Sequence, residues 1–201
     1  MKPQYESVKI GDQEWMTRNL DLDRFLNGDL IPYIESDEEW EEAGRNGQPA
    51  CCYYNNDPEN GKKYGKLYNW HAVNDPRGLA PKGNHVPSDE EWTSLMTYLG
   101  GVEIAGHKMK SVEGWDNCYE DKEIQNRNGD NSSGFNGLPG GFRIPNGSFY
   151  YIRDSAFFWS ATENGLNYAW IRSLYSNDGD VDRYYDHYAK SFGTSIRCLV
   201  D

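Results

Sequence analysis

The sequence has few large aliphatic residues for a chain of 201 residues. Leu, Ile, Val and Phe together make up about one sixth of it, and the formal net charge at pH 7 is −12. Low aliphatic content with high net charge is typical of intrinsically disordered chains. Seven Trp, fifteen Tyr and seven Phe argue against disorder, because each buried ring removes about 150–250 Å² from water. We therefore predict a folded protein with a largely aromatic core, organised as one domain over residues 1–201.

Long apolar runs and an excess of basic residues are also absent. No run of 18 apolar residues occurs, which excludes a membrane-spanning helix and predicts no membrane insertion. The chain has 20 Lys and Arg against 32 Asp and Glu, so nucleic acids and anionic membranes are disfavoured as partners. The first ten residues contain no apolar stretch of the secretory type, so we expect either a route that needs no such signal or a signal that this sequence lacks.

Cysteine and histidine are too sparse for a disulfide scaffold or a zinc site. The four cysteines, Cys51, Cys52, Cys118 and Cys198, leave one disulfide bond open as an alternative. No two of the four histidines share a helix face at the spacing of a metal site. His85 precedes a predicted helix, and we expect it to be buried and to form a hydrogen bond with a loop.

The common catalytic signatures are missing as well. The sequence contains no Gly-x-Ser-x-Gly elbow, no phosphate-binding loop and no dinucleotide fingerprint. The carboxylates of Asp178, Asp180 and Asp182 alternate as in a calcium loop, but an EF-hand needs Gly and Glu where Arg183 and Ala189 stand. We therefore expect no catalytic residue, no metal site and no cofactor, and we interpret the aspartates as a solvated acidic loop.

Two helices are predicted by their capping residues. Ser88 and Glu91 form a capping box before an apolar face that ends at Gly100. Ser36 begins the same pentapeptide, Ser-Asp-Glu-Glu-Trp, and Gly44 ends a shorter helix.

The C-terminal half is predicted to be rich in strands. An Asn-Gly pair at 146–147 predicts a hairpin over residues 142–152. Apolar and β-branched runs predict strands over residues 157–161, 168–174 and 195–200, and short helices are expected over 67–73 and 104–109. The fold class is therefore α+β, with short helices and much ordered loop.

One segment, residues 163–188, has the composition of an antibody paratope. Fifteen of its 26 residues are Tyr, Asn, Asp, Ser or His, and Tyr offers a large contact area at low entropic cost while the polar residues offer adaptable hydrogen bonds. The alternative is a polar loop whose tyrosines pack against a sheet. The candidate ligand-binding residues are Asn164, Asn167, Tyr168, Tyr175, Asn177, Asp178, Asp180, Asp182, Tyr184, Tyr185, Asp186, His187 and Tyr188.

An ordered series of motifs over residues 8–201 resembles the Fibrobacter succinogenes major paralogous domain. The series comprises IGDQEWM (10–16) with NL (19–20), YGKLYNW (64–70), HVPSD (85–89) with EW (91–92), LGG (99–101), AG (105–106) with KS (110–111), SGF (133–135) with LPGG (138–141), FWSA (158–161) and SIRC (195–198). Four tryptophans, Trp15, Trp70, Trp92 and Trp159, lie inside these motifs, and we expect them to form the core.

The resemblance implies a C-type lectin-like fold with twisted antiparallel strands and a ligand face made by its C-terminal part. That fold is shared with formylglycine-generating enzymes and with the variable proteins of diversity-generating retroelements. Residues 163–188 are similar to the diversified region of such variable proteins. We therefore expect a binding protein whose partner is a protein or glycan on a cell surface. We expect the binding protein itself to be located on an extracellular surface or in a phage virion.

Three departures limit what the resemblance implies. Ala80-Pro-Lys-Gly-Asn84 stands where the family often has Cys-Pro-x-Gly-Trp. The cysteine that would form a family-type disulfide with Cys198 is therefore missing, and we expect Cys198 to be a free, buried thiol. Formylglycine-generating enzymes need a pair of cysteines before their final Arg-Cys, and none lies between Cys118 and Cys198. The calcium-binding tripeptides of animal lectins are also missing. A structural or adhesin module of a bacterial surface protein is the first alternative, and a formylglycine-generating-type enzyme the second.

Overall fold

The computed structural model describes residues 5–120, 123–184 and 189–201, which form an α+β fold. Helical segments are concentrated in the first half of the chain. They are α1 (Asp37–Arg45), the 3-10 turn η1 (Tyr54–Asn56), α2 (Pro58–Tyr64), α3 (Trp70–Val73), α4 (Asp89–Tyr98) and α5 (Val102–Met109).

The strands are short, except for two in the C-terminal half. They are β1 (Ser7–Ile10), β2 (Gln13–Met16), β3 (Cys51–Cys52), β4 (Leu67–Asn69), β5 (Asn84–His85), β6 (Cys118–Glu120), β7 (Glu123–Gln125), β8 (Gly140–Arg143), β9 (Phe149–Ile152), β10 (Ser155–Glu163), β11 (Ala169–Tyr175), β12 (Asp182–Tyr184), β13 (Gly193–Thr194) and β14 (Leu199–Val200).

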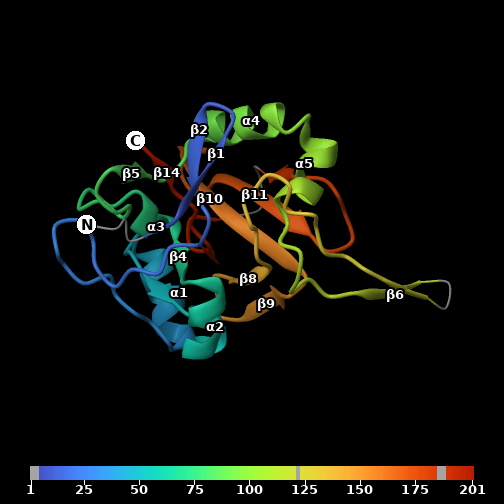
Figure 1. The fold of residues 1–201 in the computed structure, drawn as a ribbon. Coiled ribbons are helices and arrows are strands. Elements are labelled where there is room, and N and C mark those ends of the chain that lie inside the picture. Colours follow the sequence, from blue (N-terminus) through green and yellow to red (C-terminus); the bar gives the residue numbers. More distant parts are fainter. Residues whose placement is uncertain (1–4, 121–122, 185–188) are drawn as a thin grey trace.

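The strands belong to two sheets and one separate hairpin. The larger sheet has the order β12-β11-β10-β8-β13-β4-β3, and β9 extends it by pairing with β8. The smaller sheet has the order β1-β2-β14-β5, and β6 pairs with β7 in a hairpin that projects from the body (Figure 1). Helices α4 and α5 lie on one side of the long central strands and α1 and α2 on the other (Figure 1).

The capping residues begin the helices where the sequence predicts. The Ser88 hydroxyl accepts a hydrogen bond from the Glu91 amide, and the Glu91 carboxylate accepts one from the Ser88 amide, which completes the capping box of α4. Ser36 accepts from the Glu39 amide at the start of α1. The predicted 104–109 helix is confirmed as α5, and the 142–152 hairpin is confirmed as β8 and β9.

Two predicted elements are wrong in part. Residues 67–73 form a strand followed by a one-turn helix, because Tyr68 pairs with both Cys51 and Thr194 and the Asn69 side chain then caps α3. The predicted strand over 195–200 is reduced to β14, because the backbone carbonyls of Ser195, Ile196 and Cys198 accept hydrogen bonds from different segments and form no continuous ladder with one partner strand among the described residues.

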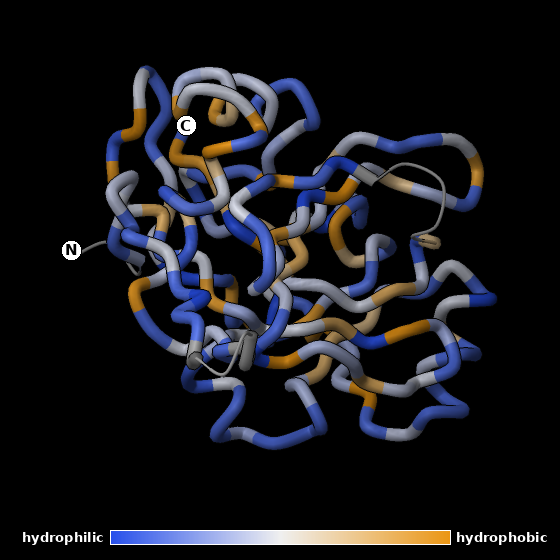
Figure 2. Tube along the Cα trace, turned by 90° about the vertical axis from the view of Figure 1, so that its right-hand side faces the viewer, coloured by the Kyte–Doolittle hydropathy of each residue, from blue (hydrophilic) through white to orange (hydrophobic). Residues whose placement is uncertain are grey.

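The core is largely aromatic, as the composition predicts. Trp15, Trp70, Trp92 and Trp159 are buried. Alternate residues of a strand point to opposite faces, so Phe157 and Trp159 of β10 belong to one apolar cluster while Phe158 belongs to another, with Trp92 of α4. In Figure 2 the loops at the lower edge are mostly hydrophilic.

Candidate functional site

The described part of the predicted segment, residues 163–184, lies at one edge of the larger sheet. Strand β12 is the outermost strand, and it pairs with β11 through Ile171↔Tyr184 and Ser173↔Asp182. The seven residues of β11 span about 23 Å, so the turn before β11 and the loop after it lie at opposite ends of that strand. The structure therefore divides the predicted site residues into two groups.

The first group lies in the turn between β10 and β11. Asn164, Asn167 and Tyr168 are found here, and the Asn164 amide donates to the Tyr168 carbonyl at 2.9 Å. Asn167 and Tyr168 are exposed, and Leu166 at the tip leaves 92% of its surface exposed. Leu166 was not predicted as a site residue, because the composition argument counted only polar and aromatic types.

This turn is fixed to the body of the protein by Lys190. The Lys190 amide donates to the Asn167 carbonyl at 2.8 Å, and its ammonium pairs with Glu163 at 3.2 Å. The same ammonium lies 4.6 Å from the centroid of the Trp70 ring, and a cation over an indole face is attracted to it. The backbone of the turn is therefore fixed to the body of the protein, while the side chains of Leu166, Asn167 and Tyr168 are exposed to solvent.

The second group lies at the other end of β11 and in the loop that follows. Its members are Tyr175, Asn177, Asp178 and Asp180, with Asp182 at the start of β12. The Tyr175 ring is half-buried and packs edge-on against Phe157, 5.7 Å between centroids. For Tyr175 the structure thus favours the alternative of a tyrosine packed against the sheet.

The 176–181 loop is fastened to α5. The His107 amide donates to the Gly179 carbonyl at 3.2 Å, and the Val181 amide donates to the Val102 carbonyl at 2.9 Å. A Cβ at Gly106 would lie 2.4 Å from the Asp180 carbonyl oxygen, so the close approach requires glycine.

The side chain of Asp178 stabilises the conformation of its own loop. The Asp178 carboxylate accepts a hydrogen bond from the Asp180 amide at 3.0 Å. Desolvation, together with the charges of Asp178 and Asp182, raises the pKa of Asp180. Among the described residues, no group of three or more His, Cys, Asp or Glu side chains is placed to hold a metal ion.

Beside this loop, Lys110 is a buried cation held by backbone oxygens. Its ammonium donates to the carbonyls of Tyr175 at 3.0 Å and Asp178 at 2.7 Å. Burial lowers the pKa of Lys110 to about 8. A hollow of about 190 Å³ adjoins it, lined in part by His107 and Asn177. Lys110 thus anchors the second group from inside the protein.

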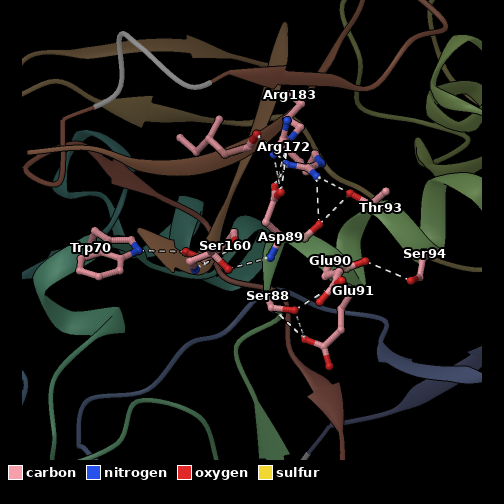
Figure 3. A network of polar contacts seen from close by, with 12 residues as sticks. Trp70, Ser88, Asp89, Glu90, Glu91, Thr93, Ser94, Ser160, Arg172 and Arg183 are labelled. Atoms are coloured by element: carbon pink, nitrogen blue, oxygen red, sulfur yellow. Dashed lines mark hydrogen bonds and ion pairs between the residues drawn. The ribbon is translucent and has the colours of Figure 1, made fainter. Parts of the chain in front are cut away.

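The two edge strands are tied to α4 by a network around Asp89 (Figure 3). The Asp89 carboxylate accepts from the buried Arg172 at 2.6 Å and from Arg183 at 2.6 Å. The Thr162 hydroxyl accepts from the Asp89 amide at 3.0 Å. Burial opposes ionisation, but the hydrogen bonds and charges of the two arginines lower the pKa of Asp89 below its usual value.

Arg183 also stacks on a neighbouring strand. Its guanidinium carbon lies 3.5 Å from the centroid of the Trp170 ring. Neither Arg172 nor Arg183 was predicted from the sequence, because the pairing with Asp89 joins residues more than 80 positions apart. Their roles are to position β11 and β12.

The side chains of five predicted site residues lie outside the described residues. Tyr184 ends β12, but its side chain lies outside the described residues. Tyr185, Asp186, His187 and Tyr188 lie outside them altogether.

Two predictions outside the segment have different outcomes. Cys51, Cys52 and Cys198 are free, buried thiols, and burial raises the pKa of Cys52 and of Cys198 to about 12. The prediction of a buried His85 is wrong, since its side chain is 40% exposed. It lies between Asp201 and Glu91, at 2.7 and 2.9 Å, because the C-terminal strand brings Asp201 beside β5.

A comparison with protein families decides what the chain is related to. The family described as the Fibrobacter succinogenes major domain matches residues 8–199. The chain belongs to this family. No curated protein and no solved structure matches the chain. Within this Fibrobacter succinogenes major domain the matched range covers both groups of candidate site residues. No helix among the described residues has the length and apolar character needed to cross a bilayer.

Proposed function

We propose that this protein binds a protein or glycan on a cell surface, and that the turn between β10 and β11 makes the first contact. The single observation that carries this proposal is the turn itself. It holds Asn167 and Tyr168 exposed beside Leu166, which is 92% exposed. An exposed leucine next to a tyrosine offers apolar contact area, and asparagine offers hydrogen bonds in both directions.

The backbone hydrogen bonds that hold the turn support binding rather than mere exposure. Binding costs the entropy of every side chain and loop that becomes ordered in the complex. The backbone hydrogen bonds from Asn164 and Lys190 fix this turn before any ligand arrives. The ordering cost is therefore confined to a few side chains.

The proposal extends to a C-type lectin-like architecture and to diversification by a retroelement. The polar and aromatic composition of residues 163–188 supports it, as does the fact that the segment stops before the buried residues Ile196 and Cys198. Sequencing the gene in close isolates tests this extension. We expect substitutions to concentrate at the candidate codons beside a near-identical template repeat, and an invariant segment would contradict it.

We further propose that the protein has no enzymatic activity of the formylglycine-generating type. Thiol chemistry needs an accessible thiolate. Cys52 and Cys198 are buried, and their raised pKa values keep them protonated at neutral pH. Turnover that disappears on changing one cysteine would contradict this proposal.

A structural or adhesin module is the second candidate function. It is favoured by the second group of predicted residues, since Tyr175 packs on Phe157 and the 176–181 loop is fastened to α5. In such a module the 163–168 turn would be a solvent-exposed connection without a ligand.

Adsorption of the purified protein to intact bacterial cells and to a glycan panel separates the two functions. We expect the double variant Leu166→Ser/Tyr168→Ala to bind at least about tenfold more weakly, because hot-spot side chains each contribute more than 1 kcal/mol. Leu30→Ser is the matched control, since Leu30 is also exposed but lies far from the turn in the sequence. Equal adsorption of the double variant and the control would contradict the proposed site.

A further inference from the structure

Two consecutive tyrosines of β9 share one aromatic surface. In a regular strand, neighbouring side chains point to opposite faces of the sheet. The rings of Tyr150 and Tyr151 nevertheless lie 6.1 Å apart, and both lie near the Phe142 ring, at 6.3 and 5.6 Å between centroids. Tyr150 is 45% exposed and Tyr151 is 55% exposed.

The backbone of the β8–β9 hairpin explains this arrangement. Tyr151 has a φ of +63°, in the left-handed region that aromatic residues rarely adopt. Gly141 has a φ of +64° and lies opposite it, between the pairs Gly140↔Ile152 and Phe142↔Tyr150. Two facing left-handed residues interrupt the alternation of the ladder, so the Tyr151 ring reaches Phe142 beside Tyr150.

Core packing does not account for this strained conformation, because about half of the surface of each tyrosine residue remains exposed to water. A left-handed aromatic residue persists only where its surroundings enforce it, and such residues cluster at ligand-binding sites. A Cβ at Gly141 would lie 2.4 Å from the Tyr150 carbonyl oxygen. The glycine therefore allows the close backbone approach that accompanies the paired rings.

The chemistry around the rings favours a sugar. A pyranose ring presents C–H groups on its face and hydroxyls at its edge. Tyrosine rings match the first, and the tyrosine hydroxyls, which donate and accept hydrogen bonds, match the second. Arg153, two residues after Tyr151 in the sequence, pairs with Asp116 at 2.7 Å.

The other occupants of an aromatic surface fit less well. Two half-exposed rings offer far less area than the roughly 800 Å² that each partner buries in a stable protein interface. The net charge of −12 disfavours a polyanionic ligand. We propose that Tyr150 and Tyr151 form a platform that binds neutral polysaccharide. This site is separate from the 163–168 turn and does not depend on the function proposed for it.

Electrophoresis through gels that contain soluble polysaccharides tests the platform. The probes are xyloglucan, galactomannan and hydroxyethylcellulose, with polygalacturonate as the anionic comparison. We expect retardation by at least one neutral polymer and none by polygalacturonate. In Tyr150→Ala/Tyr151→Asn the affinity should fall roughly tenfold or more. Asparagine is chosen because it tolerates the left-handed conformation, so the hairpin should still fold.

Three further variants make the result specific. Tyr98→Ala removes an exposed tyrosine of α4 outside the platform and should leave retardation unchanged. Tyr150→Phe/Tyr151→Phe keeps the rings and should retain most of the affinity. Leu166→Ser should also retain it, which separates this site from the turn.

Three results would overturn the inference. The first is a wild-type protein that no neutral polymer retards. The second is equal retardation of the wild type and Tyr150→Ala/Tyr151→Asn. The third is a dimer in size-exclusion chromatography that this double variant abolishes, because the two rings would then be an interface between copies of the chain.

Discussion

Several buried cationic side chains join segments that are distant in the sequence, and the chemical groups that they contact differ. Arg172 pairs with a carboxylate, that of Asp89, whereas Lys110 is held by carbonyl oxygens. Arg197 donates to the Met16 and Phe135 carbonyls and to the Asn19 side chain. Burial lowers the pKa of Arg197 to about 9. A buried cation must have its hydrogen bonds satisfied, so these contacts fix where the joined segments lie.

Removing the charge of Asp89 should destabilise the protein strongly. Asp89→Asn leaves Arg172 buried without a counter-charge, and breaking a buried ion pair from one side costs about 3–5 kcal/mol. We expect a loss near the lower end of this range in urea unfolding, since Asn can still accept a hydrogen bond. Glu41→Gln, which breaks the exposed Glu41–Arg45 pair, should change stability by less than about 1 kcal/mol. Equal effects of the two substitutions would contradict this account of Asp89.

The His85 contacts should make stability depend on pH near neutrality. Partial burial opposes protonation, but hydrogen bonds to Asp201 and Glu91 raise the pKa of His85 above its usual value. Its contribution is therefore fully present below the unfolded pKa of about 6.5 and is lost as the pH rises through the higher folded pKa. We expect the Tm difference between wild type and His85→Gln to be larger at about pH 5.5 than at about pH 8.5. A difference that grows with pH would refute this.

At the scale of elements, local sequence rules predict where the helices α1 and α4 begin. Pairing between distant segments determines which short stretches become strands. Helices α1 and α4 begin at Ser36 and Ser88 because a capping residue acts on the next three amides. Tyr68 becomes part of a strand because Cys51 and Thr194 pair with it from distant segments. A pattern within residues 67–73 carries no information about those partners.

Gly106 provides a sharp test of element packing. Replacing a helical glycine by alanine normally stabilises a helix by about 1 kcal/mol. In α5 the new Cβ would lie 2.4 Å from the Asp180 carbonyl oxygen, so we expect Gly106→Ala to destabilise by about 1–3 kcal/mol. Ser94→Ala on the exposed face of α4 should stay within about 0.5 kcal/mol. A stabilised Gly106→Ala would show that the 176–181 loop is not fastened to α5.

The candidate site shows the same division between local and distant information. Composition identified residues 163–188, and the turn residues Asn167 and Tyr168 are indeed exposed. Residue counts carry no information on where residues lie in space, however, so composition could not show that β11 separates this turn from Asp178 and Asp180. It also passed over Leu166, whose exposure follows from its place at the tip of a turn.

At the scale of the whole molecule, strand β10 joins the two main apolar clusters. Phe157 and Trp159 lie in one cluster, and Ala156 and Phe158 lie in the other. Loss of β10 would therefore remove contacts from both clusters at once.

We predict that the chain unfolds as one cooperative unit, as expected of a single domain over residues 1–201. Tryptophan fluorescence and far-UV circular dichroism should give coincident transitions in urea. Two separated transitions would indicate that the clusters unfold independently and would contradict a single domain.

The central claim, recognition through the β10–β11 turn, is tested most directly by footprinting the bound protein. The protein would be labelled with hydroxyl radicals free in solution and adsorbed on a bacterial cell type that it recognises. We predict that Leu166 and Tyr168 lose most of their labelling on adsorption, while the exposed Leu30 and Tyr98 keep theirs. Unchanged labelling of Leu166 and Tyr168 on adsorbed protein would contradict the claim.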